Sequence, residues 1–100
     1  MFVPIELDKT RNFRYGMKAI AYIEDKLNIS ISKIDLTDLT MKDTAIIICA
    51  GLIHEDKELT PDKVMDLIDD KDNLFDVIKA MEKALTASFN GNEKVIEEKN

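Results

Sequence analysis

Residues 40–53 read Thr-Met-Lys-Asp-Thr-Ala-Ile-Ile-Ile-Cys-Ala-Gly-Leu-Ile, and this stretch decides the fold. Three consecutive isoleucines alone would favour a strand. The stretch nevertheless begins with a helix start signal, because the Thr40 hydroxyl can accept a hydrogen bond from a free backbone N–H and Asp43 follows three residues later. From residue 45 onward it is apolar almost all round, which is typical of a buried helix. We therefore expect a central helix over about residues 41–53.

Two helices are expected after this one. Thr60-Pro61-Asp62 begins the first, because threonine caps, proline fits the first helical position and aspartate faces the positive helix end. It should cover about residues 61–69. The last helix should cover about residues 73–90, and Gly91 should stop it. The spacing of apolar residues gives it an inward stripe of Leu74, Val77, Ile78, Met81, Leu85 and Phe89.

The chain before the central helix predicts a hairpin and a helix. Residues 2–7 predict a short edge strand, since Pro4 has no N–H to donate. Residues 11–14 could return as the second strand, and such a marginal hairpin must pack on the helices or join a partner's strand. A helix should follow over residues 15–27, with Met17 in its apolar stripe.

The segment after this helix is ambiguous. Asn28 suits the left-handed conformation that ends many helices. Residues 29–39 alternate like a strand in part, yet Ile31, Ile34 and Leu39 could also line a short helix. We expect a connector with one helical turn.

These elements define a mainly α fold: a small helical bundle of about four helices, with or without a short N-terminal β-hairpin. A length of 100 residues favours one domain. We assign residues 1–91 to a single helical domain and residues 92–100 to a polar, frayed tail.

Charge and hydropathy exclude several partners. The formal net charge is −6, and residues 54–72 contain eight acids and three lysines. Lysine and arginine are not clustered, so nucleic acid is a poor partner. An anionic membrane surface is disfavoured by the same sign of charge, and the apolar run of residues 45–50 is too short to span a bilayer. The acidic block is either a solvated face or a surface that attracts a basic partner.

No pattern for catalysis or for a cofactor is found. The lone histidine, His54, has Glu58 four residues later where a zinc helix needs a second histidine, and we place it near the C-terminal carbonyls of its helix. Residues 69–73 fail as a calcium loop, because both possible frames lack the required later ligands. Cys49, the only cysteine, is most simply a small buried hydrophobe. We expect no enzyme activity, no metal and no cofactor.

The order of short segments resembles a known family. Arg-Tyr-Gly-Met-Lys-Ala-Ile at residues 14–20 and Ile-Glu-Asp-Lys-Leu at residues 23–27 follow the predicted hairpin. Ala-Gly-Leu at residues 50–52 ends the apolar helix, and Leu-Thr-Pro-Asp-Lys-Val at residues 59–64 begins the next. In this order and spacing, over roughly residues 5–90, they resemble the tail assembly chaperones of siphophages and related prophages.

The resemblance implies a role in virion assembly without catalysis. Proteins of this family bind the long helical tape measure protein and keep it soluble while tail tube subunits polymerise around it. They act in the cytoplasm of the bacterial host and are not expected in the mature virion. No residue role can be transferred, because the family's contacts are not fixed by a motif. Alternatives are a small regulatory module, such as an antitoxin-like inhibitor, and a minor structural subunit of the particle.

Four residues are candidates for partner binding. Phe2, Phe75 and Phe89 lie near the ends of predicted elements, where aromatic side chains can remain partly exposed. Met81 offers the flexible, polarizable packing that suits varied helical partners, although ordinary core packing explains it equally. The sequence leaves the oligomeric state open.

Overall fold

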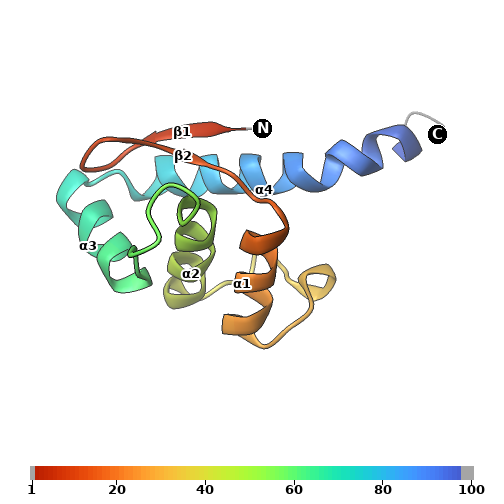
Figure 1. Ribbon diagram of the computed structural model, residues 1–100, viewed down its shortest axis with the longest axis horizontal. Coiled ribbons are helices and arrows are strands. Elements are labelled where there is room, and N and C mark those ends of the chain that lie inside the picture. The colour runs from red at the N-terminus through yellow and green to blue at the C-terminus, as the bar shows by residue number, and fades with distance from the viewer. Residues whose placement is uncertain (1, 98–100) are drawn as a thin grey trace.

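A computed structural model gives the structure of residues 2–97, and of the side chains as far as residue 89. A two-stranded antiparallel hairpin precedes four α-helices, which confirms the expected mainly α fold (Figure 1). The elements are β1 (Val3–Glu6), β2 (Thr10–Phe13), α1 (Met17–Leu27), the 3₁₀ turn η1 (Ile31–Lys33), α2 (Met41–Leu52), α3 (Pro61–Lys71) and α4 (Leu74–Glu97).

Helix α2 occupies the centre of the molecule, as its sequence predicts. It lies between α1 and α3 and beneath the hairpin and α4 (Figure 1). Its start is fixed by the expected cap, because the Thr40 hydroxyl accepts a hydrogen bond from the Asp43 N–H at 3.1 Å. Burial on nearly every side explains why β-branched residues are accepted in this helix. Its fully buried side chains include Ile47, Ile48, Cys49 and Leu52.

The hairpin packs on the helices. Val3 pairs with Phe13 and Glu6 with Thr10, so alternate residues of both strands face the core. The Asn73 side-chain amide, just before α4, donates to the Glu6 carbonyl at 2.7 Å. Apolar burial against α4 and α2 stabilises a hairpin that would be marginal alone.

Two helix ends confirm their signals. Thr60 accepts from the Lys63 N–H at 3.2 Å, with Pro61 at the first position of α3. Asn28 ends α1 with a φ of 54°. The turn η1 supplies the single helical turn expected in the connector.

Two expected helix ends are wrong. Helix α4 does not stop at Gly91 but continues to Glu97, because a glycine inside a helix costs only about 1 kcal/mol relative to alanine. Residues 92–97, expected in a polar tail, therefore belong to α4. Helix α3 continues to Lys71, where Asp72 adopts a left-handed φ of 57°.

Helix α1 begins at Met17 rather than at residue 15, and its inward face includes Ile23, as expected, but not Met17. Tyr15 is drawn into the core ahead of the helix. Ala19 and Ile23 face inward, whereas Met17 is 88% exposed. The expected apolar stripe is wrong at Met17, because Tyr15 occupies the place in the core that Met17 would otherwise fill.

Candidate functional site

The predicted partner-binding residues do not form one surface. Met81 is buried in the core, with 1% of its surface exposed. Phe75, at 78% exposure, lies in the first turn of α4, whereas Phe89 lies about 21 Å farther along that helix at 1.5 Å per residue. Phe89 lines a groove of about 390 Å³ with connector residues such as Ile31 and Leu36.

A larger groove lies elsewhere, where the end of β2, helix α1, the end of α2 and the α2–α3 loop meet. This groove has a volume of about 690 Å³, within the range of ligand sites. We call it the cationic groove, because its basic residues are Arg14, Lys18, Lys57 and His54. Its remaining residues are Gly16, Met17, Ala19, Tyr22, Ala50, Ile53 and Leu59. Phe2, a predicted site residue, lies beside it, with its ring 5.8 Å from that of His54.

One wall of the groove depends on a close approach of backbone to side chain. The Arg14 N–H donates to the Gly51 carbonyl at 2.9 Å, which joins the end of β2 to the end of α2. The Tyr15 hydroxyl donates to the Ile47 carbonyl at 2.7 Å. A Cβ atom at Gly51 would come within 2.8 Å of both Phe13 and Tyr15, so this approach requires glycine. Arg14 is thereby fixed at the rim.

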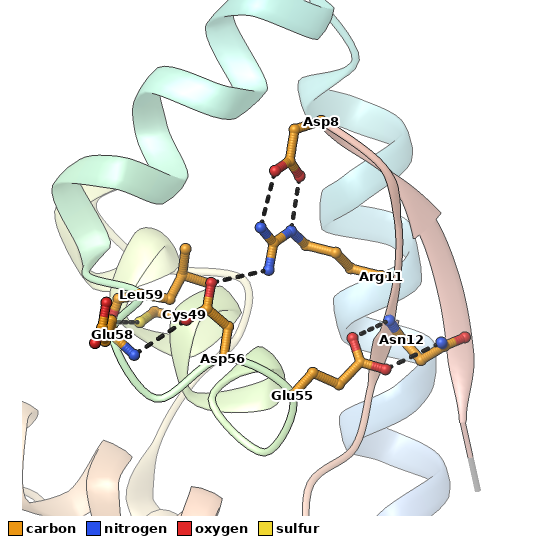
Figure 2. Close-up of polar contacts among 8 residues, drawn as sticks. All are labelled: Asp8, Arg11, Asn12, Cys49, Glu55, Asp56, Glu58 and Leu59. Carbon is orange, nitrogen blue, oxygen red and sulfur yellow. Dashed lines mark hydrogen bonds and ion pairs between the residues drawn. The ribbon is translucent and has the colours of Figure 1, made fainter.

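The opposite wall is the α2–α3 loop, which is held to the hairpin by polar contacts (Figure 2). The Glu55 carboxylate accepts from both the backbone and the side-chain N–H of Asn12 at 3.1 Å. Arg11, nearly buried, donates two hydrogen bonds to Asp8 at 2.8 and 3.0 Å and one to Asp56 at 3.5 Å. These contacts direct the carboxylates of Glu55 and Asp56 toward the hairpin.

His54 completes this attachment. Its Nε2 lies 2.7 Å from the Asn12 carbonyl, so that nitrogen must carry the proton and donate. His54 follows the end of α2, as the sequence predicts, and its ring contacts a carbonyl of the adjacent strand. Together His54 and Glu55 satisfy the outward N–H and carbonyl of Asn12, which closes that edge of the hairpin to a further strand.

Ionisation in these contacts favours the charged carboxylates. The hydrogen bond from Arg11 holds the pKa of Asp8 below its usual value of 3.8. Burial raises the pKa of Glu55, but the hydrogen bonds from Asn12 and the charges of His54 and Arg11 outweigh it, so the pKa lies below 4.5.

The floor of the groove is neutral at physiological pH. Burial, with the neighbouring Cys49, raises the pKa of Tyr22 to about 12. Burial also raises the pKa of the Cys49 thiol, which lies 3.8 Å from the Tyr22 hydroxyl and donates to the Leu59 carbonyl at 3.4 Å. The result is an apolar, uncharged floor beneath a positively charged rim.

Comparison with protein-family models, curated proteins and solved structures finds no match to this chain. Within the described residues, no three side chains of the metal-ligating types gather in one place. None of the helices in the described part of the chain is long and apolar enough to cross a membrane.

Sequence reasoning missed the cationic groove. Its basic residues come from a strand end, a helix and a loop, which are separated by as many as 43 positions along the chain from Arg14 to Lys57. Lys57 lies between Asp56 and Glu58, far along the chain from Arg14 and Lys18, so no basic cluster is visible before folding. Met17 is exposed and lines the groove, although the sequence pattern places it in the buried apolar stripe of its helix.

Proposed function

We propose that this chain is a tail assembly chaperone of a tailed bacteriophage, which binds the tape measure protein and tail tube subunits during tail morphogenesis. The observation that carries the proposal is the cationic groove, with its apolar floor and polar rim. Amphipathic helices bind in grooves of this kind by burying their apolar face. A long helical tape measure protein presents many such faces before the tube assembles around it.

The side chains beside the groove suit a partner of variable sequence. Met17 is 88% exposed and Phe2 is 58% exposed, and both border the rim. Methionine is flexible and polarizable, so it can pack against differently shaped side chains. The sequence segments that carry the family resemblance lie at the start of α1, the end of α2 and the start of α3. In this role the protein acts in the cytoplasm of the host and is absent from the mature virion.

Co-expression with a fragment of a tape measure protein tests the proposal. We expect the fragment to become soluble and to co-purify with this chain. Met17→Asp should abolish that gain, because it places a charge where an apolar helix face would bind. Met41→Asp is the matched control: Met41 is 56% exposed but lies outside the groove, so this variant should retain the effect. A fragment that stays insoluble with the wild-type chain contradicts the proposal.

Mass spectrometry of purified virions separates the other roles. A chaperone should be absent, whereas a structural subunit should be present in many copies. An antitoxin-like inhibitor would also be absent, but it would not solubilise the fragment.

A further inference from the structure

The charge of the groove opposes the charge of the protein. The whole chain has a formal net charge of −6, yet Arg14, Lys18 and Lys57 line the groove, and none of its lining residues within the described chain is acidic. Two of the three carboxylates in the α2–α3 loop, those of Glu55 and Asp56, are held by Asn12 and Arg11 on the hairpin side (Figure 2). Among side chains 2–89, the ion pairs of the structure engage Arg11 and leave the groove cations without a carboxylate partner.

A second groove shows that this imbalance is particular to the first. The concavity between the end of α1 and the start of α2 has a volume of about 520 Å³. It contains as many acids as bases, so it is neutral without a ligand. Its charged residues are Lys26, Lys33, Lys42, Asp35, Asp38 and Asp43. The cationic groove lacks such internal compensation, so an acidic partner would complement it.

The floor decides what kind of anion fits. Tyr22, Ile53 and Leu59 present apolar and aromatic surface between the cations, and covering this surface requires apolar side chains. Nucleic acid is disfavoured, because the rest of the surface is acidic and repels phosphates. A helix with an apolar stripe and carboxylates beside that stripe covers the apolar floor and pairs with the cations of the rim.

We propose that the cationic groove selects amphipathic helical segments whose apolar stripe is flanked by glutamate or aspartate. This inference rests on the proposed function, and it identifies which segments of the partner are bound preferentially. The cations also accelerate association with acidic segments, because opposite charges steer the encounter.

Three helical peptides of about 20 residues test the charge selection. They share one leucine stripe and differ only in the flanking positions, which are glutamate, glutamine or lysine. Fluorescence anisotropy measures their affinity for the full chain. We expect the glutamate peptide to bind at least about tenfold more tightly than the glutamine peptide, and the difference to shrink as salt screens the charges. Equal affinities for these two peptides would overturn the inference.

Charge reversal locates the site. The double variant Lys18→Glu/Lys57→Glu should weaken binding of the glutamate peptide by about tenfold or more. Lys33→Glu/Lys42→Glu is the matched control, because it makes the same charge change in the neutral second groove. The control should change the affinity less than about twofold, since it acts only through distant, screened charges. All four lysines are exposed, so both variants should fold, and circular dichroism verifies this. Equal losses in the two variants would contradict the assignment.

Other occupants give different results. Competition by a DNA or RNA oligonucleotide would overturn the inference in favour of phosphate binding. Self-association that Lys18→Glu/Lys57→Glu abolishes, without peptide binding, would assign the groove to a second copy of the chain. Solubilisation of the tape measure fragment tests the proposed function separately. If wild type and this double variant solubilise it equally, the charge inference fails and the proposed function stands. If the glutamate peptide binds but the chain does not bind the fragment, the charge inference stands and the proposed function fails.

Discussion

The backbone of Gly51 lies so close to the ring of Tyr15 that a Cβ atom added at Gly51 would come within 2.6 Å of the Tyr15 Cζ atom. This contact brings the end of β2 against the end of α2 and seats the Tyr15 hydroxyl on the Ile47 carbonyl. Glycine costs about 1 kcal/mol relative to alanine inside a helix. Here the close packing that it permits offsets that cost.

Substitution of this glycine should therefore destabilise the protein, although alanine is the better helix former. We expect Gly51→Ala to lower the free energy of unfolding by about 1–3 kcal/mol, because the buried Tyr15 ring must shift in a filled core. Gly16→Ala is a matched control, since a Cβ atom there meets nothing within 4 Å. Urea unfolding followed by circular dichroism measures both. A Gly51→Ala protein as stable as the control would contradict the packing argument.

The pairing of Arg11 with Asp8 predicts an asymmetry between its two partners. The Arg11 side chain is 5% exposed and that of Asp8 is 42% exposed. Asp8→Ala leaves a nearly buried guanidinium with only the longer contact to Asp56, which should cost about 1–3 kcal/mol. Arg11→Met leaves only solvated carboxylates and fills the same space, so its cost should be smaller. Chemical unfolding of both variants tests the order, and a larger loss in Arg11→Met would contradict it.

The carboxylates of Asp8 and Glu55 predict how stability depends on pH. Their pKa values are lower in the folded state than their usual 3.8 and 4.5, so folding favours the charged forms. Their contribution is complete at pH values above the unfolded-state pKa and is lost as the pH falls through the lower folded-state pKa. The free energy of unfolding should thus decline as the pH falls below about 4.5.

Denaturant titrations across this pH range measure the decline. Asp8→Asn/Glu55→Gln should flatten it, whatever that variant does to stability at neutral pH. Asp66→Asn/Asp70→Asn removes two exposed carboxylates from α3 and provides the charge-matched comparison. If Asp8→Asn/Glu55→Gln keeps the full decline of stability with falling pH, the contacts of Asp8 and Glu55 are not the cause of that decline.

Local signals predicted the elements, because their causes lie within a few residues of one another. The caps at Thr40 and Thr60 and the left-handed Asn28 each involve a backbone group at most four positions away. The end of α4 was not predictable from Gly91, since the same glycine either stops a helix or is accepted within one. The buried face of α1 depended on Tyr15, whose place in the core is set by α2.

The cationic groove was beyond the reach of such signals. Arg14, Lys18 and Lys57 come together only because Asn12 binds Glu55 and Arg14 binds Gly51, contacts that join residues at least 37 positions apart. Contacts with Asn12 and Arg11 likewise hold the carboxylates of Glu55 and Asp56 on the hairpin side, away from the groove. The acidic stretch of residues 54–72 predicts a negatively charged surface. Lys57, which belongs to that stretch, nevertheless lines the positively charged groove.

The last prediction uses Cys49 as a reporter of this region. Its sulfur is fully buried beneath the floor, and burial raises its pKa, so at neutral pH it is a protonated, inaccessible thiol. Reaction with Ellman's reagent should therefore require local opening and should be at least about a hundredfold slower than in the unfolded chain. Binding of the glutamate peptide over Tyr22, 3.8 Å from the sulfur, should slow the reaction further, because opening then requires the peptide to dissociate. The lysine peptide is the control and should leave the rate unchanged. Native labelling as fast as in concentrated guanidinium chloride would show that the floor does not cover the thiol.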